Sequence, residues 1–542
     1  MLTLKMKSVI YFTPLLLCVA AAKSKLPTAV VDAGTVVGVA SSLPSSTVVV
    51  NKFLGIPYAE PPVGSKRFLP PTPLEHFAED PYNANEWGKS CHQRNLAETD
   101  VANESEDCLT LNIYTPANAC PDTKLPVLFW IYGGNLQDGN SGRAASDGTS
   151  FVTNQNIVVV TINYRVNVFG FPSSPALPLV ESNPGFLDQR LALKWVQKNI
   201  HAFNGDPTKV TIGGESSGAS SVDRLVDSFA PPLVPPFRAA SLSSGQATVS
   251  PIERNSGPKS WASLVSTLGC NGTSSEVELA CMQTVDALDI RSVVTTTEFD
   301  WTPVTDGVTQ LELPYLTNRA AGNVAQVPIY IGTSAQEGNT LARTYDIDIP
   351  NFTEDQMTYL LNIITGGNET VNALFSGLIH SIMDTDGLSL FYAAAQSYTE
   401  LVYQCPAKLV SQATVQSGLP AWRYYHNISF PNIYLNEDPD TYPKFGAWHC
   451  ADYGLIWGTY PTENATTVEV ELSKTIQTAW ANFVKDPWGE GPGWDRVDEN
   501  GNNVACFGCD GQNSVTLINE PLVDGRCPYF DSIYAGIKSP YF

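Results

Sequence analysis

The sequence is poor in basic residues and in histidine. Lysine and arginine number 31 against 54 aspartate and glutamate residues, which gives a formal net charge of −23 at pH 7. A surface this acidic lacks the basic patches with which proteins bind nucleic acid or anionic membranes, so we expect neither partner. Because the chain has only 6 histidines, few positions can supply an imidazole as a general base.

Linkers, repeats and low-complexity tracts are also absent. No coiled-coil stretch and no Pro/Ser-rich segment divides the 542 residues. We therefore expect residues 23–542 to form a single domain with insertions.

One apolar stretch stands at the N-terminus, and no second run of about 20 apolar residues follows it. It extends from Val9 to Ala22, follows Lys5 and Lys7, and ends in small residues. The stretch is too short to span a bilayer comfortably. These features predict a secretory signal peptide over residues 1–22, and hence an extracellular protein with no stable membrane insertion.

Ten cysteines remain after the predicted signal peptide, and an even number in a secreted chain favours disulfides. Cys91–Cys108 and Cys270–Cys281 are the closest local pairs with plausible loops between them. Cys506-x-x-Cys509 has no second such pair to complete a zinc site, so a disulfide is favoured there too. The pairing of six cysteines stays open: Cys120, Cys405, Cys450, Cys506, Cys509 and Cys527.

Six Asn-x-Ser/Thr sequons fit an exported glycoprotein. They are Asn103, Asn271, Asn351, Asn368, Asn427 and Asn464.

Hydrophobic patterning indicates an α/β fold. Three nearly continuous apolar runs, at 127–131, 157–162 and 327–331, are typical of parallel strands covered on both faces. A helix over about 187–203 follows from apolar residues at helical spacing. The stretch 256–390 is rich in helical patterns, and we expect it to form a cap beside the sheet.

The most informative segment is Gly213-Gly214-Glu215-Ser216-Ser217-Gly218, which follows the β-branched run 210–212. G-x-S-x-G between a strand and a helix is the pattern of a nucleophile elbow. The flanking glycines leave room for a strained turn that presents the Ser216 hydroxyl. The turn also places the N–H groups of the following helix beside the reacting carbon.

A serine nucleophile needs a base and an acid that orients the base. His449 lies in a small-residue loop after Ser216, in the order serine, acid, histidine that α/β hydrolases use. Glu337 follows the predicted strand at 327–331 and is the candidate acid. Asp306 is the rival acid, although its Asp-Gly setting is more typical of a turn.

The reaction also needs backbone donors for an oxyanion. The residue after the nucleophile, Ser217, offers one N–H group. The loop Tyr132-Gly133-Gly134-Asn135, which follows the predicted strand at 127–131, is the candidate for the others.

With these motifs in place, the chain resembles the type-B carboxylesterase/lipase family, which includes fungal esterases and lipases and the cholinesterases. The Tyr-Gly-Gly-Asn-Leu-Gln-Asp-Gly loop is nearest to the secreted fungal carboxylesterases. The resemblance extends from about Val30 to Phe530. Besides the three site loops, it rests on seven ordered segments: 53–59, 61–64, 67–68, 105–109, 163–165, 188–190 and 204–207.

The resemblance implies an α/β-hydrolase fold, with a large, mostly parallel mixed sheet flanked by helices and with helical cap insertions. It implies a catalytic triad and an oxyanion hole formed by N–H groups, disulfides between the two local cysteine pairs, and two structural ion pairs. The implied triad is Ser216, Glu337 and His449, and the implied oxyanion hole consists of the N–H groups of Gly134, Asn135 and Ser217. The implied disulfides are Cys91–Cys108 and Cys270–Cys281, and the implied ion pairs are Arg67–Glu106 and Arg165–Asp188.

Two positions depart from the family pattern. Asn135 stands where the family usually has a third glycine, and asparagine tolerates left-handed backbone better than other side chains. Ser217 replaces the usual alanine, which leaves its N–H group in place.

The expected activity is hydrolysis of a small-molecule carboxylic ester, with no cofactor and no metal ion. The loop 92–107 is short and polar and lacks the amphipathic helix of a lipase lid, which favours short-chain or soluble esters. It also lacks the tryptophan that cholinesterases use to hold a quaternary ammonium. Phe299 and Trp301 are candidates for the acyl pocket, with core packing as the alternative. A true lipase and a non-catalytic cholinesterase-like binding protein remain alternatives. The oligomeric state stays open.

Overall fold

The computed structural model describes residues 26–94, 103–119, 123–247, 257–297, 301–312, 315–433, 445–511 and 513–536. The predicted signal peptide, Cys120 and Phe299 lie outside these ranges. Within the described ranges, no helix combines the length and the apolar character that crossing a membrane requires.

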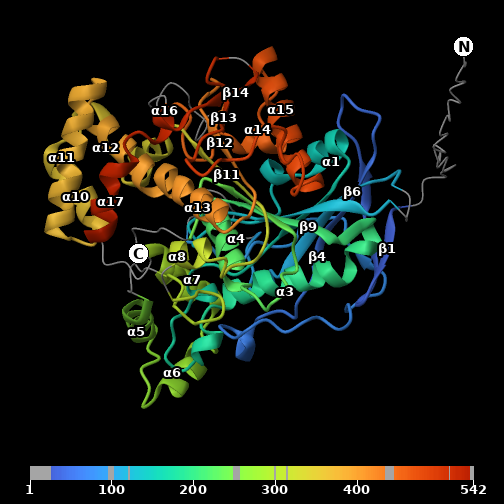
Figure 1. Cartoon of the computed structure of the whole chain (residues 1–542). Helices are drawn as coiled ribbons and strands as arrows, with labels where there is room; N and C mark the ends of the chain where they lie inside the picture. Colours follow the sequence, from blue (N-terminus) through green and yellow to red (C-terminus); the bar gives the residue numbers. More distant parts are fainter. Residues whose placement is uncertain are drawn as a thin grey trace, which may run out of the picture.

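A mixed sheet of eleven strands forms the centre of the fold (Figure 1). Its order is β14-β13-β12-β11-β10-β9-β7-β8-β6-β4-β3. The strands from β13 to β8 in this order pair in parallel, and antiparallel strands complete both edges. Their bounds are β3 Val39–Ser41, β4 Val50–Pro57, β6 Thr110–Pro116, β7 Leu125–Ile131, β8 Val158–Ile162, β9 Gly205–Glu215, β10 Ala239–Ser243, β11 Ile329–Ser334, β12 Ala421–His426, β13 Val504–Phe507 and β14 Val515–Ile518.

A second, three-stranded sheet lies near the N-terminal end of the described chain. It has the order β1-β2-β5 and consists of β1 Thr28–Val31, β2 Gly34–Val37 and β5 Tyr82–Asn83. The α/β-hydrolase fold expected from the sequence is the observed one, since a large, mostly parallel mixed sheet lies between helices.

Strand β7 shows why the apolar runs are continuous rather than alternating. Val127, Phe129 and Ile131 belong to the core on one face, together with side chains of α3 (Pro184–Asn199) and α4 (Ser217–Ser228). Leu128 and Trp130 belong to the core on the other face. A strand whose two faces are both buried needs an apolar residue at every position.

Helices cover both faces of the sheet (Figure 1). The face opposite α3 and α4 is covered by α1, α14 and α15. These three helices and five others have the bounds α1 Thr149–Gln155, α2 Asn167–Gly170, α8 Tyr315–Ala320, α9 Leu341–Thr344, α13 Cys405–Gln416, α14 Tyr453–Trp457, α15 Thr467–Lys485 and α16 Glu520–Asp524.

The helix-rich stretch 256–390 forms two separate clusters instead of one cap. Helices α5 (Gly257–Thr267), α6 (Ser275–Met282) and α7 (Ala287–Thr296) share one apolar core. Helices α10, α11, α12 and α17 share another, at the left end of the molecule in Figure 1. Strand β11 lies between the two clusters in sequence and inserts into the central sheet, which divides them. The second cluster has the bounds α10 Glu354–Thr365, α11 Glu369–Asp386, α12 Leu390–Thr399 and α17 Cys527–Gly536.

Candidate active site

The candidate nucleophile lies where β9 ends and α4 begins. Ser216 is the residue between them and has φ 56° and ψ −126°, a strained conformation for a residue with a side chain. A Cβ at Gly214 would lie 2.5 Å from the carbonyl carbon of Gly218, and a Cβ at Gly218 would lie 2.2 Å from the carbonyl oxygen of Ile131. The backbone therefore leaves room for glycine alone at both positions, as the G-x-S-x-G pattern requires.

The three residues that sequence order selected meet at the carboxyl ends of the parallel strands. His449 Nε2 lies 2.9 Å from Ser216 Oγ, and His449 Nδ1 lies 2.7 Å from Glu337 Oε2. Glu337 begins the 3₁₀ turn Glu337–Thr340 just after β11 and is fully buried. Its other oxygen accepts a 2.6 Å hydrogen bond from the Ser334 amide, so the carboxylate is held at both oxygens.

Gln336 ties the acid loop to the histidine loop. Its amide donates to the Ala447 carbonyl at 2.9 Å, and its side-chain oxygen accepts from the Ala447 amide at 2.7 Å. Glu337 follows Gln336, and His449 lies two residues after Ala447, so these contacts help to bring the two together across 112 residues of sequence. Sequence reasoning missed this role, because a glutamine in a loop carries no local signal for it.

Asp306, the rival acid, has a structural role. Its Oδ1 accepts hydrogen bonds from the amides of Val308, Thr309 and Gln310, and its Oδ2 accepts one from the Thr309 hydroxyl. The side chain closes a turn, as the Asp-Gly setting indicates.

The glycine loop after β7 passes directly beside the nucleophile. A Cβ at Gly133 would lie 2.9 Å from Ser216 Cβ. Gly134 has φ 110°, and Asn135 has φ 56° in the left-handed region that asparagine tolerates. Among the described residues, the structure records no acceptor for the Gly134 or Asn135 amide. Both amides are therefore available as donors at this edge of the sheet.

Ser217 contributes more than the N–H group expected of it. Its hydroxyl oxygen accepts a 3.2 Å hydrogen bond from the Leu136 amide, which fastens the glycine loop to the start of α4. Leu136 also has positive φ, at 58°. The hydroxyl that distinguishes Ser217 from the family's usual alanine therefore helps to hold a strained loop in place.

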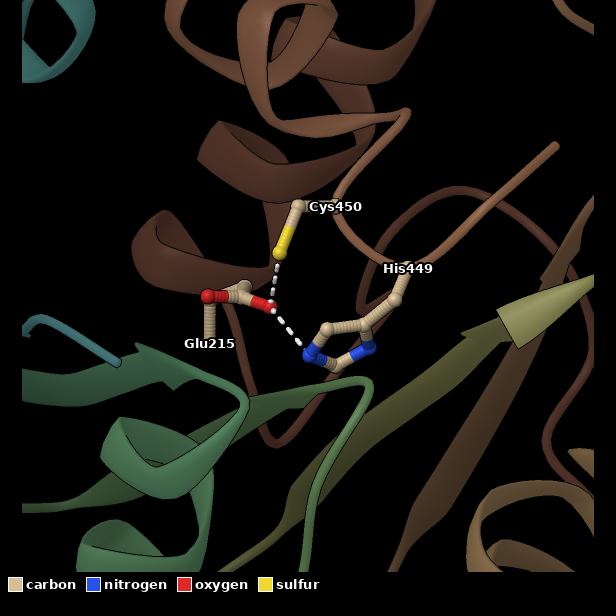
Figure 2. Close-up of side chains that lie close together, drawn as sticks. All are labelled: Glu215, His449 and Cys450. Atoms are coloured by element: carbon tan, nitrogen blue, oxygen red, sulfur yellow. Dashed lines mark hydrogen bonds and ion pairs between the residues drawn. The ribbon is translucent and has the colours of Figure 1, made fainter. Parts of the chain in front are cut away.

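Two further carboxylates, which sequence reasoning missed, lie around the imidazole. Glu215 Oε1 lies 3.4 Å from His449 Nε2, and it also accepts the Cys450 thiol at 2.7 Å (Figure 2). Asp452 is buried, and the hydroxyl of Tyr424 donates to it at 3.3 Å. The ligand atoms of Glu215, His449 and Cys450 all lie within 4.8 Å of one another.

These carboxylates set the protonation of the site. Burial lowers the pKa of His449, but the hydrogen bond and charge of Glu337, with the charges of Glu215 and Asp452, outweigh burial and raise that pKa to about 9. Burial raises the pKa of Glu215 above its usual range, and burial together with the charges of Glu337 and Glu215 raises the pKa of Asp452 to about 7. The site is therefore arranged to stabilise an imidazolium.

The expected disulfides and ion pairs are present. Cys91 is bonded to Cys108 and Cys270 to Cys281. Two pairs that the sequence left open are Cys405–Cys527 and Cys506–Cys509, and Cys450 is a free thiol. Arg67 contacts Glu106 at 2.7 Å through one guanidinium nitrogen, and Arg165 contacts Asp188 at 2.7 Å.

Trp301 lies in the apolar core beneath α5 and α7 and is fully buried. Its position fits the packing alternative.

Comparison with known proteins supports one family throughout. A family model described as the carboxylesterase family matches residues 25–519. Carboxylesterase 1C of Rattus norvegicus is 30% identical over 491 residues, covering 86% of this chain and 87% of the relative. Para-nitrobenzyl esterase of Bacillus subtilis (strain 168) is 30% identical over 510 residues, covering 89% and 95%. Cholinesterase of Mus musculus is 30% identical over 485 residues, covering 82% and 76%. The family match includes the whole central sheet and every loop of the candidate site.

Proposed function

Because the chain belongs to the carboxylesterase family and is thus a carboxylic-ester hydrolase of the serine type, we propose that it hydrolyses short-chain or soluble esters through an acyl-enzyme on Ser216. The observation that supports this most directly is the line of contacts from Ser216 Oγ to His449 Nε2, at 2.9 Å, and from His449 Nδ1 to Glu337, at 2.7 Å.

In the first half of the reaction, Ser216 Oγ attacks the ester carbonyl carbon while His449 Nε2 takes the hydroxyl proton. The carbonyl oxygen becomes an oxyanion, which the amides of Gly134, Asn135 and Ser217 receive. When the tetrahedral intermediate collapses, the carbon–oxygen bond to the alcohol breaks. His449 returns the proton to the leaving alkoxide, and the acyl group remains on Ser216.

In the second half, water repeats these steps with His449 as the base. Water adds to the acyl carbon, the bond to Ser216 Oγ breaks, and the free acid leaves. Glu337 holds the imidazole so that Nδ1 carries the proton and Nε2 is free to act, and it stabilises the imidazolium that forms in each half.

The preference for short-chain or soluble esters is supported by the loop between Cys91 and Cys108. In its described part, Glu104 is buried and contacts Arg291 at 2.9 Å, and Glu106 contacts Arg67. Two carboxylate–guanidinium pairs thus fasten the described C-terminal end of this loop to the body of the protein. We expect no sharp rise in rate when an ester exceeds its solubility, and such a rise would favour the lipase alternative.

Secretion and glycosylation are also part of the proposal, with residues 1–22 as the signal peptide and residues 23–542 as a single domain. All six sequon asparagines are exposed, as glycan attachment requires. Four disulfides fit an oxidising compartment. N-terminal sequencing and glycosidase treatment of the protein collected from culture medium would test this.

Substitution of the triad tests the mechanism. Ser216→Ala should reduce turnover of a p-nitrophenyl ester by roughly 10⁶-fold and abolish labelling by a fluorophosphonate probe. Glu337→Gln should cost on the order of 10⁴-fold, whereas Asp306→Asn should affect stability more than turnover. A folded Ser216→Ala protein with near-normal turnover would refute the mechanism. Failure of the unsubstituted protein to react with the probe would favour the non-catalytic alternative.

A further inference from the structure

We propose that Glu215, His449 and Cys450 form an inhibitory binding site for Zn²⁺ or a similar thiophilic divalent cation. Figure 2 shows the Cys450 thiol and the His449 imidazole both directed at one carboxylate oxygen of Glu215. Imidazole nitrogen, thiolate sulfur and carboxylate oxygen are together the ligand types that select zinc over the hard cations Mg²⁺ and Ca²⁺.

The spacing of the nitrogen and the oxygen already matches a tetrahedral zinc ion, and all three atoms lie within 4.8 Å of one another. With the usual zinc bond lengths, a nitrogen and an oxygen ligand lie roughly 3.3 Å apart, and a sulfur and an oxygen ligand roughly 3.5 Å apart. Glu215 Oε1 and His449 Nε2 are already 3.4 Å apart. Cys450 Sγ is 2.7 Å from the same oxygen because its proton lies between them. Loss of that proton lets the sulfur move to the zinc-bound spacing.

The imidazole is already oriented as in metal sites. A metal-binding histidine typically donates its other ring N–H to a carboxylate, which fixes the ring and raises its basicity. Here Nδ1 contacts Glu337 at 2.7 Å, and Nε2, which is hydrogen-bonded to Ser216 Oγ at 2.9 Å, lies 3.4 Å from Glu215 Oε1. None of these contacts of His449 involves Cys450.

The charges balance on binding. The S–H bond of Cys450 breaks, its proton goes to solvent, and a bond from sulfur to zinc forms without electron transfer. His449 also gives up its Nε2 proton to solvent and supplies the lone pair, so the thiolate and the Glu215 carboxylate cancel the charge of the ion. The charges of Glu337 and Asp452 add negative potential at the imidazole. The positive charge of Arg143 acts in the opposite sense and favours the ionised form of Glu215.

Two of the three residues are in contact with solvent. Cys450 and His449 are both partly exposed, whereas Glu215 is buried. Ser216 Oγ, 2.9 Å from Nε2, or a water molecule can fill the fourth position.

The inhibitory half of this inference rests on the proposed function, because zinc would occupy the lone pair that His449 needs as a base. The binding half rests on the three side chains alone. The test therefore uses one readout for each half.

For binding, the full-length protein is titrated with Cd²⁺ as a spectroscopic substitute for Zn²⁺, and thiolate-to-metal absorption in the ultraviolet is measured. Cys120 lies outside the described residues, so Cys120→Ser serves as the background for every variant. We expect the band in this background and its loss in Cys450→Ala. Zinc should also slow alkylation of Cys450, mapped by mass spectrometry, which needs no change at the site itself.

For inhibition, Zn²⁺ should abolish ester hydrolysis, and a chelator should restore it. Cys450→Ala should raise the zinc concentration for half-inhibition by about tenfold or more. The matched control is His380→Ala, which removes an exposed histidine that pairs with Glu354 and should leave zinc inhibition unchanged.

Absence of the cadmium band in the Cys120→Ser background, or unchanged alkylation of Cys450 in zinc, would overturn the site. If the band and the protection appear in a protein without esterase activity, the zinc site stands and the proposed function fails.

Discussion

The pH dependence of turnover offers the sharpest test of the electrostatics around His449. Glu215→Gln removes one carboxylate charge, keeps the shape of the side chain, and leaves an oxygen that can accept the Cys450 thiol. Glu215 Oε1 lies 3.4 Å from His449 Nε2, and the charge of Glu215 is one of the causes that raise the pKa of His449 to about 9.

The size of the effect follows from that distance. Two unit charges at this separation interact by about 1 kcal/mol in bulk water and about 5 kcal/mol at an effective dielectric constant of about 20. Since one pKa unit corresponds to about 1.4 kcal/mol, the range is about 1 to 4 units. Burial raises the pKa of Glu215 and thereby weakens its charge, so we expect a shift near the lower end, about one unit.

The sign is downward. The charged imidazole loses a favourable partner, so His449 gives up its proton at lower pH, and the acid limb of kcat/KM moves to lower pH by about one unit. The assay is kcat/KM for a soluble p-nitrophenyl ester across the pH range. Glu354→Gln is the matched control, because it removes an exposed carboxylate that lies 3.0 Å from His380. An acid limb that stays in place or moves upward in Glu215→Gln would refute the reasoning.

Three further predictions concern stability. Gly218→Ala should lower the free energy of unfolding by about 1–3 kcal/mol or more, because the new Cβ would lie 2.2 Å from a carbonyl oxygen of β7; Gly377→Ala, in open space on α11, should instead be neutral or stabilising in the same urea titration. Burial raises the pKa of Asp452 to about 7, so the folded state holds a proton that the unfolded state has lost between about pH 4 and 7, and stability falls across that window by up to about 1.4 kcal/mol per pH unit. Asp452→Asn should therefore gain free energy of unfolding relative to the unsubstituted protein as pH rises from 4 to 8, and a constant difference would contradict this. Replacing both Cys405 and Cys527, which are 122 residues apart, by serine should cost about 5 kcal/mol through loop entropy, and an unchanged thermal midpoint would contradict it.

Several features of the fold could be predicted because their cause is local. The run at 127–131 lies in β7, and the run at 157–162 contains β8. The helix predicted over 187–203 begins earlier, at Pro184, and ends as an α-helix at Asn199 before a 3₁₀ turn. Proline at the first helical position was the signal that could have moved its start.

Features that depend on distant residues could not be predicted in the same way. Cys405–Cys527 joins segments 122 residues apart, and spacing alone does not determine which of six cysteines pair. Strand β11 divides the helix-rich stretch because it pairs with β10 and β12 in the central sheet. The residues of β11 alone do not indicate these partners.

The elbow at Ser216, its strained turn and the serine–acid–histidine order were determined by the sequence itself, since each follows from residue types within a few positions or from chain order. The positions of Glu215, Cys450 and Asp452 around one imidazole were decided by the tertiary structure. Their electrostatic effect depends on distances of a few ångströms, and those distances arise where loops from different strands meet at one edge of the sheet.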